Sequence, residues 1–554
     1  MEGTVKTSTG TWLAVLCSFV LATAYVTPAT PRAQGGRFNA ARAVEGKPAE
    51  LSKVAPVIDA LRRRAGRVPT PQIADPTMLA DLRKADSPSG SWTDTGCVSR
   101  NEMRAMVDEY LATPDPNFFP AFGPTIPAMS VAWSAPGCGT FIYAAGLKNV
   151  EKHLRISPGT PMGLASMSKA VIAAVALQLS DRGVFGPRGV DTSVGELLSP
   201  AKVRALTVGD DPSAPHCPGT TFLYNRGTGQ FELAPFDCPD LFHVTLRNLM
   251  LSNHGMYDFL NEVALPDGNF QFDESVFYSL YKYLGIDAVP PVSGRNGFEY
   301  LKAAGLKRDG GATIGGTRGR DFEASLGNTG FQLLGVVLED VTGKSLDALI
   351  EQFVVQPLRI DPIFLQLGTE PRENTIANGY EVTTGDPLFE QSGVYPLTDL
   401  HGHTAVNKAV LGLGKPANLN LAGGAGGLVA TMPSYRAFFD GFVNGGLLSP
   451  AAQSVLDASF VSIPDFDSPG VTVRVGFALV NLKNTGLPGV PDSQIIFHDG
   501  SLEGIRCFNA VVREHDSNRT FAVGAMCQNS HGSGVPSIVD LWLQFITRIA
   551  QARE

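Results

Sequence analysis

The stretch GLASMSKAVIAAVALQL, residues 163–179, places a serine and a lysine three positions apart at the head of a long apolar run. The run predicts a buried helix that begins near Ser166. Positions i and i+3 share one face of a helix, about 5 to 6 Å apart at Cβ. The amine of Lys169 can therefore reach the hydroxyl of Ser166.

This pair has both a chemical and a structural interpretation. A serine hydroxyl is a weak nucleophile, and a lysine can act as its base only when burial or nearby cations lower the amine pKa from about 10.4. The apolar run would supply burial, and the free N–H groups of a first helical turn can bind an oxyanion. The alternative is an ordinary helix-start serine beside a lysine whose amine reaches water, because a short motif is weak evidence by itself.

Composition limits the class of protein. The chain has 554 residues, of which 44% are hydrophobic and 18% charged. This composition predicts a globular protein with a large hydrophobic core. The net charge is -9, and no long basic run is present. We therefore expect no nucleic-acid partner.

The N-terminus resembles an export signal. Residues 12–26 are apolar but fewer than the roughly 20 that span a bilayer, and Ala22-Thr23-Ala24 is a small-x-small cleavage site. We predict a signal peptide over residues 1–24 and a secreted or periplasmic protein. An uncleaved segment that anchors the chain in a membrane is the alternative.

Six cysteines remain after such a signal is removed, and an exported chain can oxidise them. Cys507 and Cys527 are equidistant from residue 517 in the turn Asp516-Ser517-Asn518, so they should face each other across a hairpin. Cys97 with Cys138, and Cys217 with Cys238, are the remaining local pairs. No Cys-x-x-Cys occurs, and HGH at 401–403 is interpreted as a loop, so no metal is predicted.

The order of patterns predicts the architecture. Residues 25–95, rich in Ala, Arg and Pro, are interpreted as an N-terminal extension and linker, and residues 96–554 as one domain. A helix is expected over 100–112 and a hairpin over 126–135 and 139–147, around Pro136-Gly137. Strand patterns return at 472–482, 493–500, 504–514 and 519–527, and a last helix over 535–551 has one apolar face: Ile538, Leu541, Trp542, Phe545 and Ile549. The predicted fold class is α/β (α+β), with an antiparallel sheet flanked by N- and C-terminal helices and a large, mainly helical insertion.

A second wall for a site is expected at FHDGSLEGIRC, residues 497–507, at the exit of a strand. Gly500 would let a substrate backbone lie close, and His498 could bind a carboxylate or polarise a carbonyl. The N–H of Ser501 could be an oxyanion donor. The alternative for His498 is a satisfied surface residue.

Together these segments resemble the serine beta-lactamase and penicillin-binding-protein superfamily, especially the class C beta-lactamase-like branch with its small-ester hydrolases and D-amino-acid peptidases. The resemblance covers about residues 97–530. It is carried by SMSK (166–169), by the segments at 326–360 and 425–450, and by the His-x-Gly of residues 498–500. The segment at 243–260 also resembles the family's helix and loop ahead of the second motif, with its usual histidine shifted.

The resemblance implies a beta-lactamase/transpeptidase-like fold and a metal-free, cofactor-free acyl-enzyme mechanism. In it Ser166 would be the acylated nucleophile and Lys169 the base or proton relay, while Asn328 would hold the substrate amide or the lysine. His498 and Gly500 would line the third-motif strand. The N–H groups of Ser166 and Ser501 would form the oxyanion site. The resemblance thus implies that the catalytic residues are Ser166, Lys169 and His498. It implies that the substrate-binding residues are Asn328, Gly500 and Ser501.

One departure matters. Where the family has tyrosine or serine two positions before the asparagine, this chain has Leu326, which cannot move a proton, and no Tyr-x-Asn occurs elsewhere. Three accounts remain open: Lys169 acts alone on good-leaving-group esters, another side chain enters the pocket, or the protein only binds. The candidate side chains are Tyr224, His254, Tyr257 and Tyr380. We predict an exported serine hydrolase of an ester, amide or peptide, with a non-catalytic binding protein as the alternative; oligomeric state is left open.

Overall fold

The computed structural model describes the chain in segments. They are residues 88–112, 126–149, 154–209, 217–225, 230–258, 262–263, 297–318, 327–365, 375–382, 406–408, 423–464, 467, 471–483, 485, 487, 493–502, 505–514, 519–532 and 537–553. The proposed signal peptide and most of the proposed extension lie outside them.

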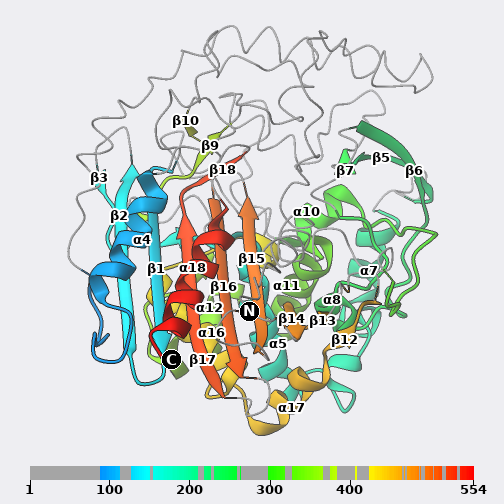
Figure 1. The fold of residues 1–554 in the computed structure, drawn as a ribbon. Coiled ribbons are helices and arrows are strands. Elements are labelled where there is room, and N and C mark those ends of the chain that lie inside the picture. The colour runs from blue at the N-terminus through cyan, green and yellow to red at the C-terminus, as the bar shows by residue number, and fades with distance from the viewer. Residues whose placement is uncertain are drawn as a thin grey trace, which may run out of the picture.

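A nine-stranded antiparallel sheet forms the centre of the described structure (Figure 1). In spatial order its strands are β12 (Val461–Ser462), β13 (Thr472–Gly476), β14 (Leu479–Lys483), β15 (Ser493–Leu502), β16 (Ile505–Glu514), β17 (Thr520–Gln528), β1 (Ala128–Ala135), β2 (Gly139–Asn149) and β3 (Leu154–Arg155). β1 and β2 form the predicted hairpin, and β1 pairs with β17, so that Ala132 lies opposite Ala525. The prediction of a sheet built from both ends of the domain is confirmed.

One predicted strand region differs in detail. Residues 472–482 form two strands, β13 and β14, that pair with each other around Phe477 and Ala478. Ala478 has φ +55°, the left-handed conformation that a non-glycine residue rarely adopts. Because the turn contains no Asn, Asp or Pro, the sequence pattern gives little sign of it.

Two helices cover one face of the sheet, α4 (Arg100–Ala112) and α18 (Ile538–Gln551) (Figure 1). The five apolar residues predicted for the inner face of the last helix are all buried. Trp133 of β1 stacks on Phe545 with ring centroids 5.0 Å apart. α4 buries Met103, Met106, Val107, Tyr110 and Leu111. Burying each such apolar side chain contributes about 1.5 to 3 kcal/mol, which holds both terminal helices on the sheet.

Residues just before the proposed domain boundary at residue 96 already pack against the sheet. Ser89 forms a bridge to Ile142 of β2, and Trp92 is 1% exposed against Phe141. The indole Nε1 of Trp92 donates to the carbonyl of Val98 at 2.8 Å. Contacts with the sheet therefore reach back to Ser89, within the segment interpreted as a linker from its polar composition.

The described part of the insertion between β3 and β12 is mainly helical, as predicted. Its helices are η2 (Ala165–Met167), α5 (Ser168–Asp181), η3 (Gly189–Asp191), α6 (Val194–Leu197), α7 (Pro200–Thr207), α8 (Leu246–Leu251), α10 (Gly297–Ala304), α11 (Asn328–Thr342), α12 (Leu346–Ile350), η5 (Glu351–Val355), α13 (Gln356–Leu358), α15 (Gly423–Gly426), α16 (Met432–Asn444) and α17 (Pro450–Ala458). α5 is buried over residues 168–179, and it lies in the hydrophobic core that the helices of the insertion share with the inner face of the large sheet. This pattern of burial on all sides explains its uniformly apolar sequence.

Three small sheets complete the described fold. They are β10 (Val406–Lys408) with β9 (Tyr380–Val382) and β18 (Ser530–Gly532); β4 (Met162–Gly163) with β11 (Leu428–Ala430) and β8 (Phe364–Leu365); and β6 (Gln230–Phe236) with β5 (Gly219–Asn225) and β7 (Glu262–Val263). The second of these lies at the entry to η2. It fixes the chain just before the serine of the motif.

All three predicted disulfides are present: Cys97–Cys138, Cys217–Cys238 and Cys507–Cys527. Cys507 lies directly opposite Cys527 in the register of β16 and β17, as the hairpin argument requires. Disulfides of this kind are typical of proteins that fold in oxidising surroundings.

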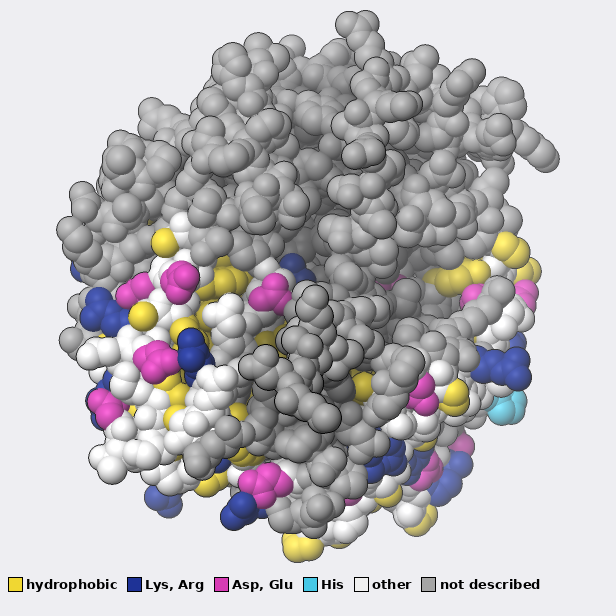
Figure 2. Space-filling model, in the orientation of Figure 1, with side chains coloured by type: hydrophobic (Ala, Val, Ile, Leu, Met, Phe, Trp, Pro, Cys, Tyr) yellow, Lys and Arg dark blue, Asp and Glu magenta, His cyan; other side chains and the backbone are white. Residues whose placement is uncertain are grey.

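On the face shown in Figure 2, acidic and basic side chains are interspersed over the described surface. Of the helices in the described segments, none combines the length and the apolar character needed to cross a bilayer.

Candidate active site

Ser166 stands in a tight turn that leads directly into α5. We call Leu164–Met167 the nucleophile turn. Ala165 in this turn has φ +48°, and Ser166 is half-buried. The turn is held at both ends, because the N–H of Leu164 donates to the carbonyl of Leu428 at 2.8 Å and the hydroxyl of Tyr435 donates to the carbonyl of Met167 at 2.7 Å.

Lys169 joins the serine to a second element. Its Nζ lies 2.7 Å from Ser166 Oγ and 2.7 Å from Asn328 Oδ1. Lys169 is fully buried, and Asn328 is the first residue of α11, 8% exposed. The residue before it, Gly327, has φ +79°, which a glycine adopts at no steric cost. The structure thus brings together Ser166, Lys169 and Asn328, all three named from the sequence.

The chain of contacts continues to a residue that the sequence reasoning missed. Asn328 Nδ2 donates to Asp258 Oδ2 at 2.9 Å, and Asp258 is 6% exposed. The loop that carries Asp258 is fixed to α11, because Thr329 Oγ1 donates to the carbonyl of Tyr257 at 2.7 Å. The sequence offered no signal for Asp258, since its partner lies 70 positions away and no local spacing links them.

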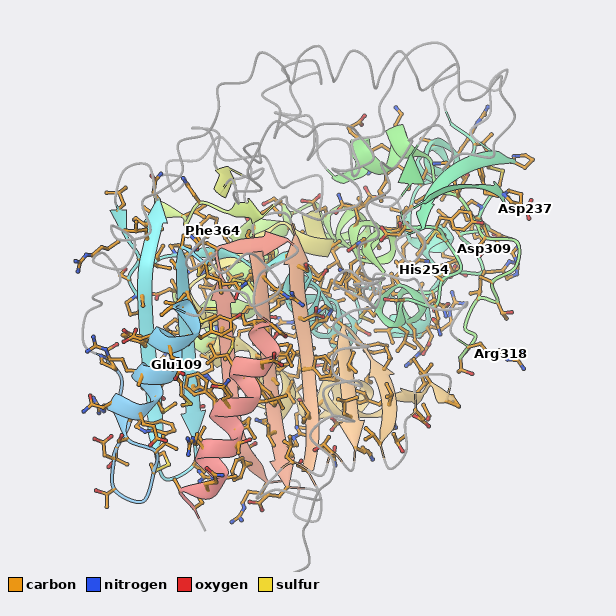
Figure 3. All side chains as sticks on the ribbon, turned by 45° about the horizontal axis from the view of Figure 1, so that its top comes forward. Glu109, Asp237, His254, Asp309, Arg318 and Phe364 are labelled. Atoms are coloured by element: carbon orange, nitrogen blue, oxygen red, sulfur yellow. A yellow bond between two sulfur atoms is a disulfide. The ribbon has the colours of Figure 1, made fainter. Side chains whose placement is uncertain are left out.

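Two candidates for the role of the missing tyrosine lie in this same loop. His254 is 1% exposed, its Nδ1 accepts from the N–H of Met256 at 3.1 Å, and it packs on Gly330 of α11 (Figure 3). The hydroxyl of Tyr257 donates to the carbonyl of Pro235 at 3.1 Å. Leu326 and the side chains of Tyr224 and Tyr380 lie outside the described residues.

His498 is a buried member of β15, not a surface residue at the exit of a strand. Burial, and after it the electrostatic effect of Lys169 when that amine is protonated, lowers the pKa of His498 from 6.5 to about 3. Its Nδ1 lies 2.5 Å from the carbonyl oxygen of Asp499, which can only accept, so the proton of the neutral ring sits on Nδ1. Nε2 therefore presents a lone pair, and among the described residues it has no hydrogen-bond partner.

This protonation state corrects one expectation. A neutral ring with its only N–H already bound cannot pair with a carboxylate or polarise a carbonyl. His498 can instead accept a hydrogen bond from an N–H or O–H group.

Gly500 lies directly against the nucleophile turn. A Cβ at this position would lie 2.2 Å from the carbonyl oxygen of Leu164 and 3.3 Å from Cβ of Ala165. The glycine thus makes room for the nucleophile turn, and its expected approach to a substrate backbone stays a prediction. It brings β15 and the turn into contact, with Ser501 the next residue along the strand.

Among the described residues, no strand pairs with β15 beyond Phe497 on the side of β14. β14 pairs with β15 only as far as Val480 opposite Phe497, while β16 accompanies β15 on its other side through Leu502. The segment from His498 to Ser501 therefore borders the nucleophile turn. That the N–H groups of Ser166 and Ser501 form an oxyanion site stays a prediction.

The geometry can support proton transfer at a serine. A buried amine within 2.7 Å of Ser166 Oγ can take its proton, and the amide of Asn328 fixes the direction of that amine. Among the described residues, no group of three or more His, Cys, Asp or Glu side chains is arranged to hold a metal ion.

Comparisons with known proteins bear on the fold and the family of the chain. Among curated proteins none matches the sequence. The structure is similar to D-amino acid amidase from Ochrobactrum anthropi SV3, with 16% identity and a TM-score of 0.51 over 82% of this chain and 99% of that one. It is also similar to a D-stereospecific amidohydrolase from Streptomyces sp., with 17% identity and a TM-score of 0.48 over 79% and 97%. The family model described as Beta-lactamase matches residues 104–538, most of the chain, and the chain therefore belongs to the beta-lactamase family.

Proposed function

We propose that this member of the beta-lactamase family is an exported serine hydrolase that acts on an ester, amide or peptide through an acyl-Ser166 intermediate. The observation that carries the proposal is the 2.7 Å contact between Lys169 Nζ and Ser166 Oγ with the amine fully buried. Burial disfavours the charged form of an amine, and only the neutral amine can accept a proton. The same contact favours an enzyme over a binding protein, which has no need to bury a lysine at a serine.

In the first half-reaction Ser166 Oγ attacks the substrate carbonyl carbon. The Oγ–C bond forms, the hydroxyl proton moves to Lys169 Nζ, and the carbonyl π pair moves onto oxygen. When the tetrahedral intermediate collapses, the bond to the leaving group breaks and the leaving group takes the proton from Lys169. The acyl group remains on Ser166.

In the second half-reaction water attacks the acyl carbon. Its proton moves to Lys169 Nζ, the bond to Ser166 Oγ breaks, and Oγ recovers the proton from Lys169. The backbone N–H groups of Ser166 and Ser501 would bind the developing oxyanion. The Nε2 lone pair of His498 would accept a hydrogen bond from a substrate N–H or hydroxyl, a requirement that an ester without such a group does not meet.

Fluorophosphonate labelling of the purified protein, followed by peptide mapping, tests the proposal. We expect an adduct on Ser166 that disappears in Ser166→Ala and forms at least about 10²-fold more slowly in Lys169→Met, because general base help is worth about 10² to 10⁴. Ser454→Ala is the control. Ser454 is an exposed serine of α17 whose hydroxyl donates to the carbonyl of Pro450 at 2.9 Å, so its loss should leave labelling unchanged.

A protein that unfolds cooperatively but forms no adduct on Ser166 would contradict the proposal and favour a ligand-binding role. Export is tested separately by expressing the whole chain in a bacterial host and sequencing the N-terminus of the product. We expect cleavage near residue 24; recovery of the uncleaved chain in the membrane fraction would contradict it.

A further inference from the structure

Four side chains form a continuous line from a carboxylate to the nucleophile. Asp258 Oδ2 accepts from Asn328 Nδ2 at 2.9 Å, Asn328 Oδ1 accepts from Lys169 Nζ at 2.7 Å, and Lys169 Nζ reaches Ser166 Oγ at 2.7 Å. Asp258, Asn328 and Lys169 are each less than 9% exposed. The line joins four elements: the loop after α8, the start of α11, the start of α5 and η2.

The two hydrogen bonds of Asn328 determine the orientation of its amide. A carboxylate oxygen of Asp258 accepts, so the amide nitrogen of Asn328 must face Asp258, and the amide oxygen is left to face Lys169. The amide dipole then points its negative end at Lys169. A negative carboxylate behind it adds a second favourable field in a site that water does not screen.

A buried lysine that gains a proton needs such support. Charging an amine in a low-dielectric interior is costly unless an opposite charge lies close by. In the mechanism above, Lys169 becomes an ammonium as Ser166 attacks. Asp258 lies one amide away from that ammonium, as the aspartate of a Ser-His-Asp triad lies behind the imidazolium.

We propose that Asp258 is a positioning residue that orients Asn328 and stabilises the ammonium form of Lys169 while Ser166 is acylated. The inference rests on the proposed function, because it assigns Asp258 to the same proton transfer. Asp258 exchanges no proton in this scheme. Its charge acts on Lys169 through the amide of Asn328.

Other titratable groups come from the elements packed around Lys169. The loop after α8 contributes His254 and Tyr257, β15 contributes His498 and Asp499, and α16 contributes Tyr435. The hydroxyl of Tyr435 is committed to Met167, and burial raises its pKa well above the usual range, so it does not ionise. His498 stays neutral down to about pH 3, so it does not change charge in the working range.

The test is the rate of fluorophosphonate labelling at Ser166 as a function of pH, in the wild type and in Asp258→Asn. The asparagine can still accept from Asn328, so the variant removes the charge and keeps the hydrogen bond. Labelling needs neutral Lys169. Without the carboxylate, the ammonium form of Lys169 is less stable. The acidic limb of the pH–rate profile, where labelling slows as Lys169 is protonated, should therefore move to lower pH by about one unit or more. The rate on the plateau of the profile should fall about 10-fold to 100-fold.

Two further variants make the result specific. Asp258→Ser removes the charge with a smaller side chain and carries the test if Asp258→Asn does not fold. Asp237→Asn is the charge-matched control: Asp237 is exposed and lies at the outer edge of the structure beside β6 (Figure 3), so neither limb nor plateau should change.

The outcomes separate the two proposals. If the wild type is labelled on Ser166 but the limb stays in place in a folded Asp258 variant, Asp258 has no electrostatic role and only this inference is overturned. If the plateau rate falls but the acidic limb of the pH–rate profile does not shift, Asp258 has only a structural role, and this result also overturns the inference. If the folded wild type is not labelled at any pH, the proposed function fails, and this inference fails with it.

Discussion

Gly500→Ala is the sharpest test of how the nucleophile is positioned. The added Cβ would lie 2.2 Å from the carbonyl oxygen of Leu164, and carbon–oxygen contacts normally begin at about 3.3 Å. The strand and the nucleophile turn must therefore separate by about 1 Å. Gly500 does not have a positive φ, so the alanine introduces a steric conflict without backbone strain.

The separation should cost both activity and stability. A misplacement of about 1 Å reduces catalytic rates about 10²-fold, and overpacking costs about 1 to 3 kcal/mol of unfolding free energy. We expect labelling at Ser166 to slow by about 10²-fold at constant pH. Gly159→Ala is the control, since Gly159 is exposed and the nearest atom to its added Cβ is Ser157 Oγ at 4.0 Å. Labelling of Gly500→Ala at the wild-type rate, with an unchanged melting temperature, would refute the contact between turn and strand as the basis of the geometry.

Two further predictions concern stability. The pKa of His498 is about 3 in the folded chain and about 6.5 when unfolded, so the unfolded state takes up a proton first as pH falls. His498 therefore lowers the free energy of unfolding progressively between about pH 6.5 and 3, by a few kcal/mol at most. In urea unfolding, His498→Gln should weaken the fall of the midpoint over that pH range, and an unchanged fall would contradict the assignment. Replacing Cys507 and Cys527 together by alanine should lower the unfolding free energy by about 2 to 4 kcal/mol, because their disulfide closes a loop with a sequence separation of 20. If calorimetry finds no loss of stability in the double variant, the disulfide contributes nothing to the stability of the fold.

The sequence predicted most of what depends on local pattern. The apolar face of α18, the hairpin of β1 and β2 and the partnership of Cys507 with Cys527 follow from period, turn residues and symmetric spacing. The approach of Lys169 to Ser166 follows from helical geometry. In each case the residues that interact are close in sequence or related by a simple register.

The sequence could not supply what depends on packing between distant segments. Asp258 is one of many loop aspartates until α11 brings Asn328 against it. The role of Gly500 depends on the path of the nucleophile turn, and the protonation of His498 depends on burial and on a carbonyl next to it. The turn at Ala478 was hidden because its residues have no particular preference for turns.

The pairing of β1 with β17 also has a consequence for how the chain folds. β1 lies near the start of the described domain and β17 near its end, so the centre of the sheet cannot form until nearly the whole domain has been synthesised. Until then β1 has an unpaired edge rich in apolar residues, which is the kind of strand that associates with other chains. A chain shortened before β17 should therefore aggregate instead of folding into a smaller enzyme, and successful folding should depend on protecting β1 during the long interval before its partner arrives.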